Sequence, residues 1–280
     1  MFRLCGFADE IGPDLGQQIA TCQKTGVTHF ELRGVGGVNV LDFSGEQRRE
    51  IKQKLGDAGI GVASIGSPCG KKPIDLPDGE LLDMFRVALD AAVHFESPFI
   101  RVFSFYPPGG EGKGDVAAIK DRAIDLLAKQ AAILDESGTE VVMVHENEKG
   151  IYGDIGRRCL ELMEAVDSPR LRSAFDFANF VQCGENPLDN WPLLKPYTAH
   201  IHIKDALAGT GEVVPAGRGD GHIGEILSDA HASGYDGFLS LEPHLKVAGH
   251  SHGETGPELW ETAVTALRAV CRERNLPLAS

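Results

Sequence analysis

The sequence predicts a single (β/α)8 barrel that spans residues 1–280. Eight short apolar or β-branched runs recur along the chain, and longer segments with helical periodicity separate them. Neither a shift in composition nor a Pro/Gly/Ser-rich linker divides the chain into parts. Regular alternation of strands and helices is typical of a parallel sheet covered by helices, and eight repeats within 280 residues match a closed barrel.

The expected strands are continuous apolar runs, as in strands that are buried on both faces. They are residues 2–8, 27–32, 60–65, 98–104, 140–146, 171–176, 198–203 and 237–242. The main alternative is a doubly wound open sheet, which would favour a GxGxxG turn after the first strand; this chain has none. The Gly-rich segment 208–221 is expected to form a long loop between a strand and a helix.

Several segments between the strands carry helix-capping signals. Residues 44–47 and 255–258 both match the capping box, with a Ser or Thr followed three positions later by Gln or Glu. Residues 115–136 repeat apolar side chains every three to four positions, which predicts an amphipathic helix. Glycines at 59, 138 and 234 are expected just beyond helix ends.

Composition excludes several classes of partner. The formal net charge is −14, which disfavours nucleic acid and anionic membrane surfaces, although a local cation or a metal could still bind a small phosphorylated substrate. No apolar run approaches the roughly 20 residues of a membrane span, and the N-terminus lacks the apolar stretch of a signal peptide. The six cysteines are scattered and form no CxxC pair, which fits reduced thiols. A cytoplasmic protein is expected.

Polar side chains gather where the predicted strands end, and in this architecture chemistry lies at the C-terminal ends of the strands. The last four strands end in three carboxylates and one imidazole, namely Glu146, Asp176, His202 and Glu242. Oxygen-rich ligands with one nitrogen suit a divalent metal such as Mn²⁺, Mg²⁺ or Co²⁺, and Zn²⁺ is also open. The alternative is structural: glutamates paired with Arg or Lys, and a packed, hydrogen-bonded imidazole.

Four runs also carry a resemblance to a known family: VHENE at 144–148, FDFAN at 175–179, HIHIKD at 200–205 and LSLEPH at 239–244. In order and spacing, the chain resembles the sugar-phosphate isomerase/epimerase family of xylose-isomerase-like barrels. The resemblance implies a metal, Mn²⁺ first among the candidates, held by Glu146, Asp176, His202 and Glu242. It also implies that Glu146 and Glu242 move the proton. The sequence departs from the family at Asn179, where many members have a histidine; an amide can bind a hydroxyl but does not titrate.

The remaining strand-end residues provide candidate substrate contacts. These are Arg101, Lys204, Asn179 and Glu31. Arg101 and Lys204 could equally form salt bridges with the glutamates, and Glu31 could support the site or lie at its rim. His145 is expected to point away from Glu146, because neighbours on a strand face opposite sides. The histidines at 222, 250 and 252 are expected at the surface.

The leading hypothesis is therefore a metal-dependent isomerase or epimerase of a ketose, keto-polyol or sugar phosphate. Proton removal next to a carbonyl would give an enediolate that a divalent cation stabilises. A dehydratase on a keto-polyol begins with the same step and is the alternative. A metal-dependent nuclease would need more strand-end histidines and a basic groove, and a catalytically inactive sugar-binding barrel would not need all four ligands. A small sugar or polyol is the expected partner, and a homo-oligomer is possible.

Overall fold

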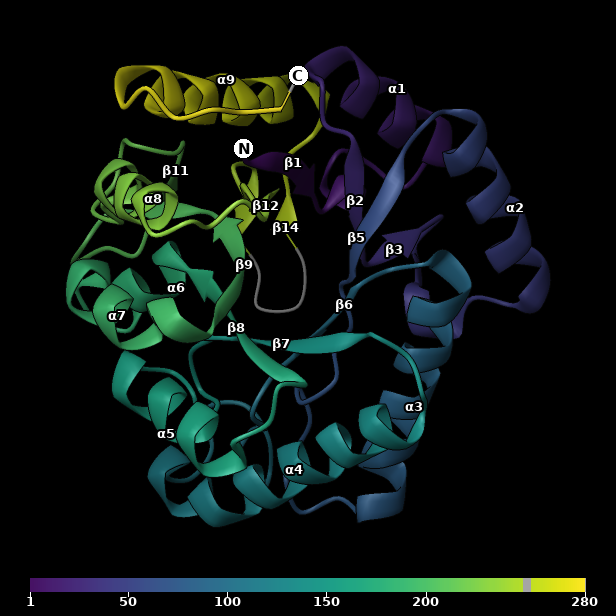
Figure 1. Ribbon diagram of the computed structural model, residues 1–280, viewed down its shortest axis with the longest axis vertical. Helices are drawn as coiled ribbons and strands as arrows, with labels where there is room; N and C mark the ends of the chain where they lie inside the picture. The colour runs from purple at the N-terminus through teal and green to yellow at the C-terminus, as the bar shows by residue number, and fades with distance from the viewer. Residues whose placement is uncertain (249–252, 280) are drawn as a thin grey trace.

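The chain folds into a closed barrel of eight parallel strands, which confirms the predicted (β/α)8 architecture. The computed structural model describes residues 1–248 and 253–279. Around the barrel the strands follow the order β1-β12-β9-β8-β7-β6-β5-β2. Each barrel strand therefore pairs with the next barrel strand along the chain, and the last, β12, pairs with the first, β1. Figure 1 shows the helices arranged as an outer ring around these strands, with both chain ends close together.

All eight predicted strands are present, most of them one to three residues shorter than expected. Their bounds are β1 (Arg3–Gly6), β2 (His29–Leu32), β5 (Gly61–Ile65), β6 (Phe99–Val102), β7 (Val142–Glu146), β8 (Leu171–Asp176), β9 (Thr198–Ile203) and β12 (Phe238–Leu241). Alternation along each strand separates two environments. On β9, Ile201 and Ile203 belong to the large apolar core, whereas His200 and His202 point to the opposite side, the barrel interior.

The α-helices pack their apolar faces on the outside of the barrel. Their bounds are α1 (Leu15–Thr25), α2 (Gly45–Asp57), α3 (Asp78–Phe95), α4 (Lys120–Glu136), α5 (Gly156–Val166), α6 (Phe177–Gln182), α7 (Pro187–Leu194), α8 (Ile223–Ala232) and α9 (Pro257–Glu273). Four short 3-10 helices add to these: η1 (Ala8–Glu10), η2 (Val40–Asp42), η3 (Val116–Ile119) and η4 (Lys195–Tyr197). The predicted helix over 115–136 is confirmed as η3 followed by α4.

One of the two predicted capping boxes is confirmed and the other is wrong. The Ser44 hydroxyl accepts from the backbone N–H of Gln47, and the Gln47 side chain accepts from the backbone N–H of Ser44. At the second site α9 begins after Gly256, without a side-chain cap, and the Thr255 hydroxyl donates to Glu10 instead. A contact across 245 positions of sequence therefore outweighs the local capping pattern. The glycines at 59, 138 and 234 do follow helix ends, each with a positive φ.

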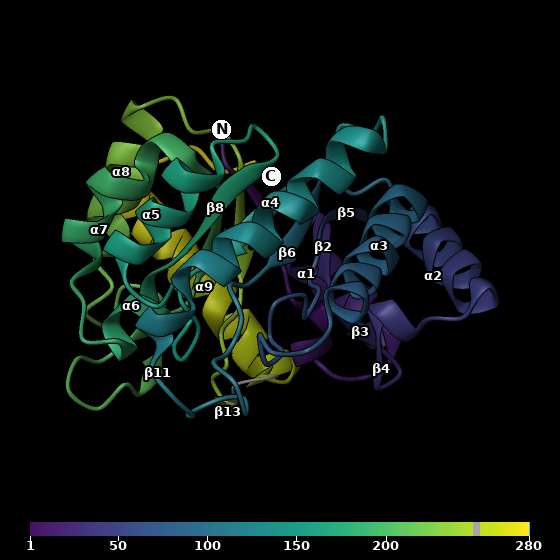
Figure 2. The same ribbon diagram turned by 90° about the horizontal axis from the view of Figure 1, so that it is seen from below.

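Small hairpins extend the end of the barrel at which the strands terminate. They are β3–β4 (Gly34–Val35 and Val38–Asn39), β10–β11 (Asp205–Ala206 and Val213–Val214) and β13–β14 (Val247–Ala248 and Gly253–Glu254). In Figure 2 the labels of these hairpins lie at the lower end of the molecule, and the chain termini lie at the upper end. The predicted loop 208–221 does connect β9 to α8, but it contains β11, so part of it forms a hairpin strand and is not loop. The Asp205 carboxylate accepts from the backbone N–H groups of three of its glycines, Gly217, Gly219 and Gly221.

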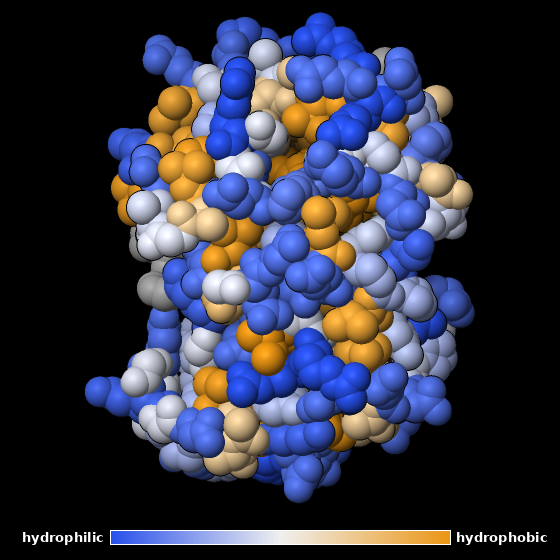
Figure 3. All heavy atoms as spheres, turned by 90° about the vertical axis from the view of Figure 1, so that its left-hand side faces the viewer, coloured by the Kyte–Doolittle hydropathy of each residue, from blue (hydrophilic) through white to orange (hydrophobic). Residues whose placement is uncertain are grey.

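The surface has no large continuous apolar region on the face that Figure 3 shows, where apolar side chains are interspersed with polar ones over α5 to α8. No helix in the part of the chain that the structure describes is both long and apolar enough to cross a membrane. His222 is exposed as expected, whereas His250 and His252 lie outside the described residues. Five of the six cysteines are buried and none forms a disulfide.

Candidate metal centre

Strand register brings the four predicted ligands together inside the barrel. Asp176 on β8 and Ser240 on β12 both pair directly with His202 on β9. Side chains two positions further along a strand point to the same side, one level nearer the C-terminal end. Lys204 and Glu242 therefore lie one level beyond His202. Glu146 ends β7, the next strand around the barrel from Asp176.

The geometry of this cluster suits a metal ion. Each of Glu146, Asp176, His202 and Glu242 offers one ligand atom, and the four atoms all lie within 4.8 Å of one another. The imidazole Nδ1 of His202 is 3.3 Å from Glu146 Oε1 and 3.8 Å from Glu242 Oε2. Both this Nδ1 and Asp176 Oδ2 are buried and form no hydrogen bond of normal geometry among the described residues, although the Lys204 ammonium lies 3.1 Å from Asp176 Oδ2. Buried polar atoms normally have hydrogen-bond partners, so these two atoms could also bind a ligand.

Three buried cations contact the same carboxylates: Lys204, Arg101 and Arg33, whose Nη1 lies 3.5 Å from Glu242 Oε1. The Lys204 ammonium is 2.9 Å from Glu242 Oε2 and 3.1 Å from Asp176 Oδ2. The Arg101 guanidinium donates to Glu146 Oε2 at 3.1 Å and lies 3.5 Å from Glu242 Oε1. For Arg101 and Lys204 the sequence allowed either a substrate contact or a salt bridge with the glutamates. In the structure both residues form salt bridges. Arg101 connects the two glutamates that are candidates for proton transfer.

The pKa values of the three carboxylates differ: those of Glu146 and Glu242 are lowered, and that of Asp176 is raised. Burial opposes the ionisation of Glu146, but the nearby charges of His202 and Arg101 lower its pKa to about 2. Burial acts in the same direction on Glu242, and Lys204 and His244 outweigh it, so the pKa of Glu242 lies well below its usual range. For Asp176 burial prevails over the attraction of Lys204 and raises its pKa to about 6. Both glutamates are therefore ionised at neutral pH.

Beneath the cluster a buried carboxylate supports His202 from its other nitrogen. Glu31 Oε2 lies 3.2 Å from His202 Nε2, 2.8 Å from His200 Nε2 and accepts from the Ser240 hydroxyl at 2.6 Å. Glu31 is 1% exposed and lines none of the cavities at the mouth of the barrel. The Glu31 carboxylate thus lies on the inner side of His202, so a role in supporting His202 fits its position better than the predicted substrate contact.

Asn179 also contacts the cluster rather than open space. Its side-chain amide donates to Glu146 Oε1 at 3.1 Å and to the Asn147 carbonyl at 2.8 Å. The same residue lies in the first turn of α6, which Asp176 caps, since Asp176 Oδ1 accepts from the Asn179 backbone N–H at 2.8 Å. Asp176 therefore caps the helix with Oδ1 and faces the cluster with Oδ2. The hydrogen bond from the Asn179 amide holds Glu146 in its orientation.

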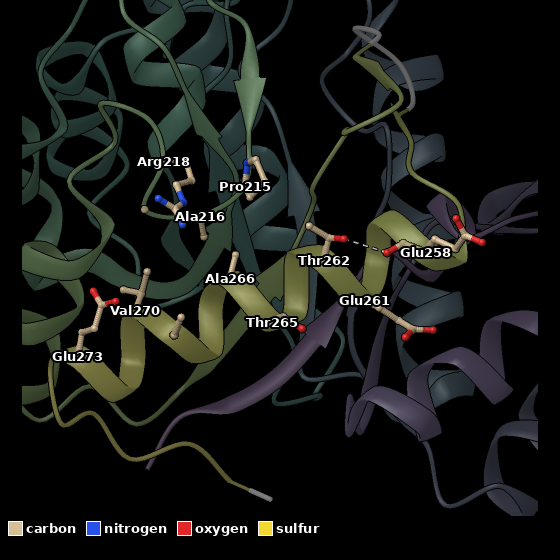
Figure 4. A pocket seen from close by; sticks show the side chains of 12 residues that line it. Pro215, Ala216, Arg218, Glu258, Glu261, Thr262, Thr265, Ala266, Val270 and Glu273 are labelled. Carbon is tan, nitrogen blue, oxygen red and sulfur yellow. Dashed lines mark hydrogen bonds between the residues drawn. The ribbon is translucent and has the colours of Figure 1, made fainter.

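A cavity of about 410 Å³ gives access to the cluster from the C-terminal end of the barrel. Glu242, Arg101 and His244 line it, together with Arg33 and Lys71. A different cavity of about 650 Å³ lies between α9 and residues 215–218 (Figure 4). The side chains that Figure 4 labels there, among them Arg218, Glu261 and Glu273, include none of the four predicted ligands. The first of these two cavities is therefore the candidate substrate site.

Comparison with known proteins assigns the family. A family model described as a xylose isomerase-like TIM barrel matches residues 19–270. The chain belongs to this family. One curated relative is the uncharacterized protein MJ1311 of Methanocaldococcus jannaschii, which is 25% identical to this chain over 165 residues. The matched residues cover 58% of this chain and 56% of MJ1311. The chain thus matches only about half the length of that relative.

Solved structures of the same fold carry different chemistry. A D-tagatose 3-epimerase-like protein superposes with a TM-score of 0.74 at 18% identity, covering 97% of this chain and 99% of the other. The probable 3-DHS dehydratase AsbF of Bacillus anthracis superposes with a TM-score of 0.70 at 17% identity, covering 95% and 98%. Similarity at this level of identity establishes the shared fold. Epimerases and dehydratases are both represented on it.

Three residues near the cluster were not predicted from the sequence. They are His200, Ser240 and Glu10. His200 and Ser240 could have been found, because each lies two positions before a predicted ligand and so shares its face of the strand. Glu10 could not, since its contacts with Thr255 and with the backbone N–H of His244 join the two ends of the chain. His145 is buried and lies outside the cluster, as expected.

Proposed function

We propose that this xylose isomerase-like barrel is a divalent-metal-dependent isomerase or epimerase of a ketose or keto-polyol. The observation that carries the proposal is the convergence of three carboxylates and one imidazole within 4.8 Å, with two of the carboxylates held by one arginine. Mn²⁺ is the first choice for this oxygen-rich set, and Mg²⁺, Co²⁺ and Zn²⁺ remain alternatives. The ligands would be Glu146, Asp176, His202 and Glu242.

A bound divalent cation would polarise a ketone carbonyl and stabilise negative charge on its oxygen. The chain supplies the proton transfer. Glu146 ends β7 and Glu242 follows β12, so they reach the site from different strands. One glutamate, ionised, would take the proton from the carbon next to the carbonyl, and a protonated glutamate would then return a proton to that carbon or its neighbour. Arg101, which contacts both, would hold them in place and lie next to the developing charge.

Glu31 has a supporting role in this proposal. A metal-ligating histidine usually donates its second ring nitrogen to a carboxylate, which fixes the tautomer and the ring orientation. Glu31 Oε2 occupies that position at Nε2 and leaves Nδ1 directed at the cluster. Asn179 acts in the same way on Glu146. Both residues would position ligands, and neither would touch the substrate.

The proposal is tested by proton exchange. The Mn²⁺-loaded protein is incubated in D₂O with a panel of ketoses and inososes, and deuterium at the α-carbon is followed by NMR. We expect exchange on at least one substrate, and a loss of roughly 10²–10⁴-fold in Glu146→Gln and Glu242→Gln. The matched control is Glu50→Gln, an exposed glutamate on α2 that pairs only with Lys54 among the described residues.

Three results would contradict or redirect the proposal. A metal-loaded protein that exchanges no α-proton on any substrate would contradict enolisation. Exchange accompanied by an unsaturated product that absorbs in the ultraviolet would favour the dehydratase, which shares the first step and for which AsbF is a structural neighbour. Full turnover in Glu146→Gln would contradict the role of the glutamate in either reaction.

A further inference from the structure

The two carboxylate oxygens of Glu242 have different neighbours. Oε2 lies 2.9 Å from the Lys204 ammonium and 3.8 Å from His202 Nδ1, on the side of the other predicted ligands. Oε1 has three nitrogen atoms at nearly equal distances, namely Arg33 Nη1 at 3.5 Å, Arg101 Nη1 at 3.5 Å and His244 Nε2 at 3.6 Å. The orientation of Glu242 therefore depends on side chains outside the predicted ligand set.

Glu10 contacts two of these three side chains with a single oxygen. Its Oε1 lies 3.3 Å from His244 Nε2 and 3.8 Å from Arg33 Nη2. Its other oxygen, Oε2, accepts from the backbone N–H of His244 at 2.9 Å. The Glu10 side chain is fully buried. One buried carboxylate thus holds both the ring and the backbone of the residue that lies against Glu242 Oε1.

Glu10 is itself held by the segment that leads into α9. Its Oε2 also accepts from the Thr255 hydroxyl at 2.6 Å. Its backbone carbonyl accepts from the N–H groups of Thr255 at 2.9 Å and Gly256 at 2.8 Å. Networks of hydrogen bonds of this kind restrict the motion of buried polar side chains. Glu10 therefore has little freedom to move, and the same applies to the His244 ring.

The backbone of His244 has a conformation that only local constraints maintain. Its φ is +45°, in the left-handed region that residues other than glycine seldom adopt. Residues in such regions persist where the surrounding structure imposes the conformation, and they are frequent at functional sites. The hydrogen bond from the His244 N–H to Glu10 is one such constraint. His244 also lines the candidate substrate cavity, so the constraint acts at the site.

We propose that Glu10 is a positioning residue for Glu242 and that it acts through the imidazole of His244. The inference rests on the proposed function, in which Glu242 binds the metal and takes part in proton transfer. Outer partners that orient a metal-ligating side chain affect both metal affinity and activity. If Glu10 only held the segment before α9 in place, its loss would lower stability and leave metal affinity unchanged.

The primary test is a double-mutant cycle on Mn²⁺ affinity, measured by calorimetry on protein stripped with a chelator. Glu10→Gln keeps the size of the side chain and an oxygen that accepts from His244 and Thr255. His244→Asn removes the ring, and asparagine tolerates the left-handed conformation. We expect Glu10→Gln to lower Mn²⁺ affinity about 10-fold in the unmodified chain, and less than about threefold when His244→Asn is already present. An equal loss in both backgrounds would overturn the inference, because Glu10 would then act without His244.

Thr255→Val is the matched control. It removes a hydrogen bond to the same oxygen of Glu10 and leaves both the Glu10 charge and the His244 ring in place. We expect it to lower the unfolding temperature and to change Mn²⁺ affinity by less than about threefold, the scale of one neutral hydrogen bond. A loss of affinity as large as in Glu10→Gln would refute the inference, since the attachment of the segment before α9 would explain both results.

Exchange kinetics separate this inference from the proposed function. On a substrate of the D₂O panel that exchanges its α-proton, Glu10→Gln should lower the rate at saturation about 10-fold and leave KM within about threefold. His244→Asn should lower the same rate by a similar factor, and the double variant should lower it no further. A raised KM with an unchanged rate would contradict a role in positioning Glu242. If the unmodified chain exchanges no α-proton, the proposed reaction fails, and the Mn²⁺ cycle still decides the role of Glu10.

Discussion

The contact between Glu31 and His202 gives the most direct prediction about metal binding. Glu31→Gln keeps the size of the side chain and removes its charge. The mutated position faces His202 Nε2 at 3.2 Å and His200 Nε2 at 2.8 Å, both fully buried. Loss of a carboxylate behind a metal-ligating histidine typically lowers metal affinity 10- to 100-fold. At about 1.4 kcal/mol for each factor of ten, this corresponds to roughly 1.4–2.7 kcal/mol.

The assay is Mn²⁺ titration by calorimetry on protein stripped with a chelator, at one pH and ionic strength. Ser240→Ala is the matched control, since it removes another partner of the same Glu31 oxygen and leaves the charge in place. We expect Ser240→Ala to change Mn²⁺ affinity by less than about fivefold, the cost of one neutral hydrogen bond. Thermal unfolding of both variants establishes that each remains folded.

The reasoning would be refuted by a folded Glu31→Gln protein that binds Mn²⁺ as tightly as the unmodified chain. In that case His202 would not depend on Glu31 for its tautomer, and the ligand atom assigned to His202 would be wrong. A loss of affinity in Ser240→Ala as large as in Glu31→Gln would show that packing around the oxygen, and not its charge, supports the histidine.

Three further predictions concern charge and backbone. Lys204→Met should destabilise chelator-treated protein by about 3–5 kcal/mol in thermal or urea unfolding, because it leaves buried carboxylates uncompensated, and added Mn²⁺ should restore much of this; an unchanged stability would contradict it. Gly70→Ala should cost at least about 1 kcal/mol, since φ is +88° and a Cβ would lie 2.0 Å from the Phe103 carbonyl oxygen; a neutral effect would show that the backbone can move there. Hydrogen bonds from Lys120 and Tyr152 lower the pKa of Glu161 to about 2, so the stability it contributes is complete above the unfolded pKa near 4.5 and is lost as pH falls towards 2. The difference in unfolding temperature between the unmodified chain and Glu161→Gln should therefore shrink between pH 4.5 and 2, and a constant difference would contradict the pairing.

Local sequence was sufficient to predict the strands and to name the candidate ligands. Each strand is a short apolar run, so its position follows from composition without knowledge of its neighbours. The end of each strand marks the same face of any parallel barrel, which is why Asp176 and His202 could be placed together before their distances were known. The helix over 115–136 follows from local pattern in the same way, whereas the short strand β11 within the expected loop 208–221 was not predicted.

Local sequence pattern could not predict the contacts between residues on opposite sides of the closed barrel. The sequence named Glu31 as a candidate site residue but could not choose between a substrate contact and a supporting role, because nothing local shows that β2 faces His200 on β9 across the interior, 169 positions away. Thr255 matched a capping box, yet its hydroxyl donates to Glu10, which barrel closure brings beside it. Thus the sequence by itself determined the barrel and its strands, and it named the four candidate ligands that the structure brings together. Only the tertiary structure decided what holds each ligand, because hydrogen-bond partners are chosen by distance in space and a closed barrel makes residues from opposite ends of the chain neighbours.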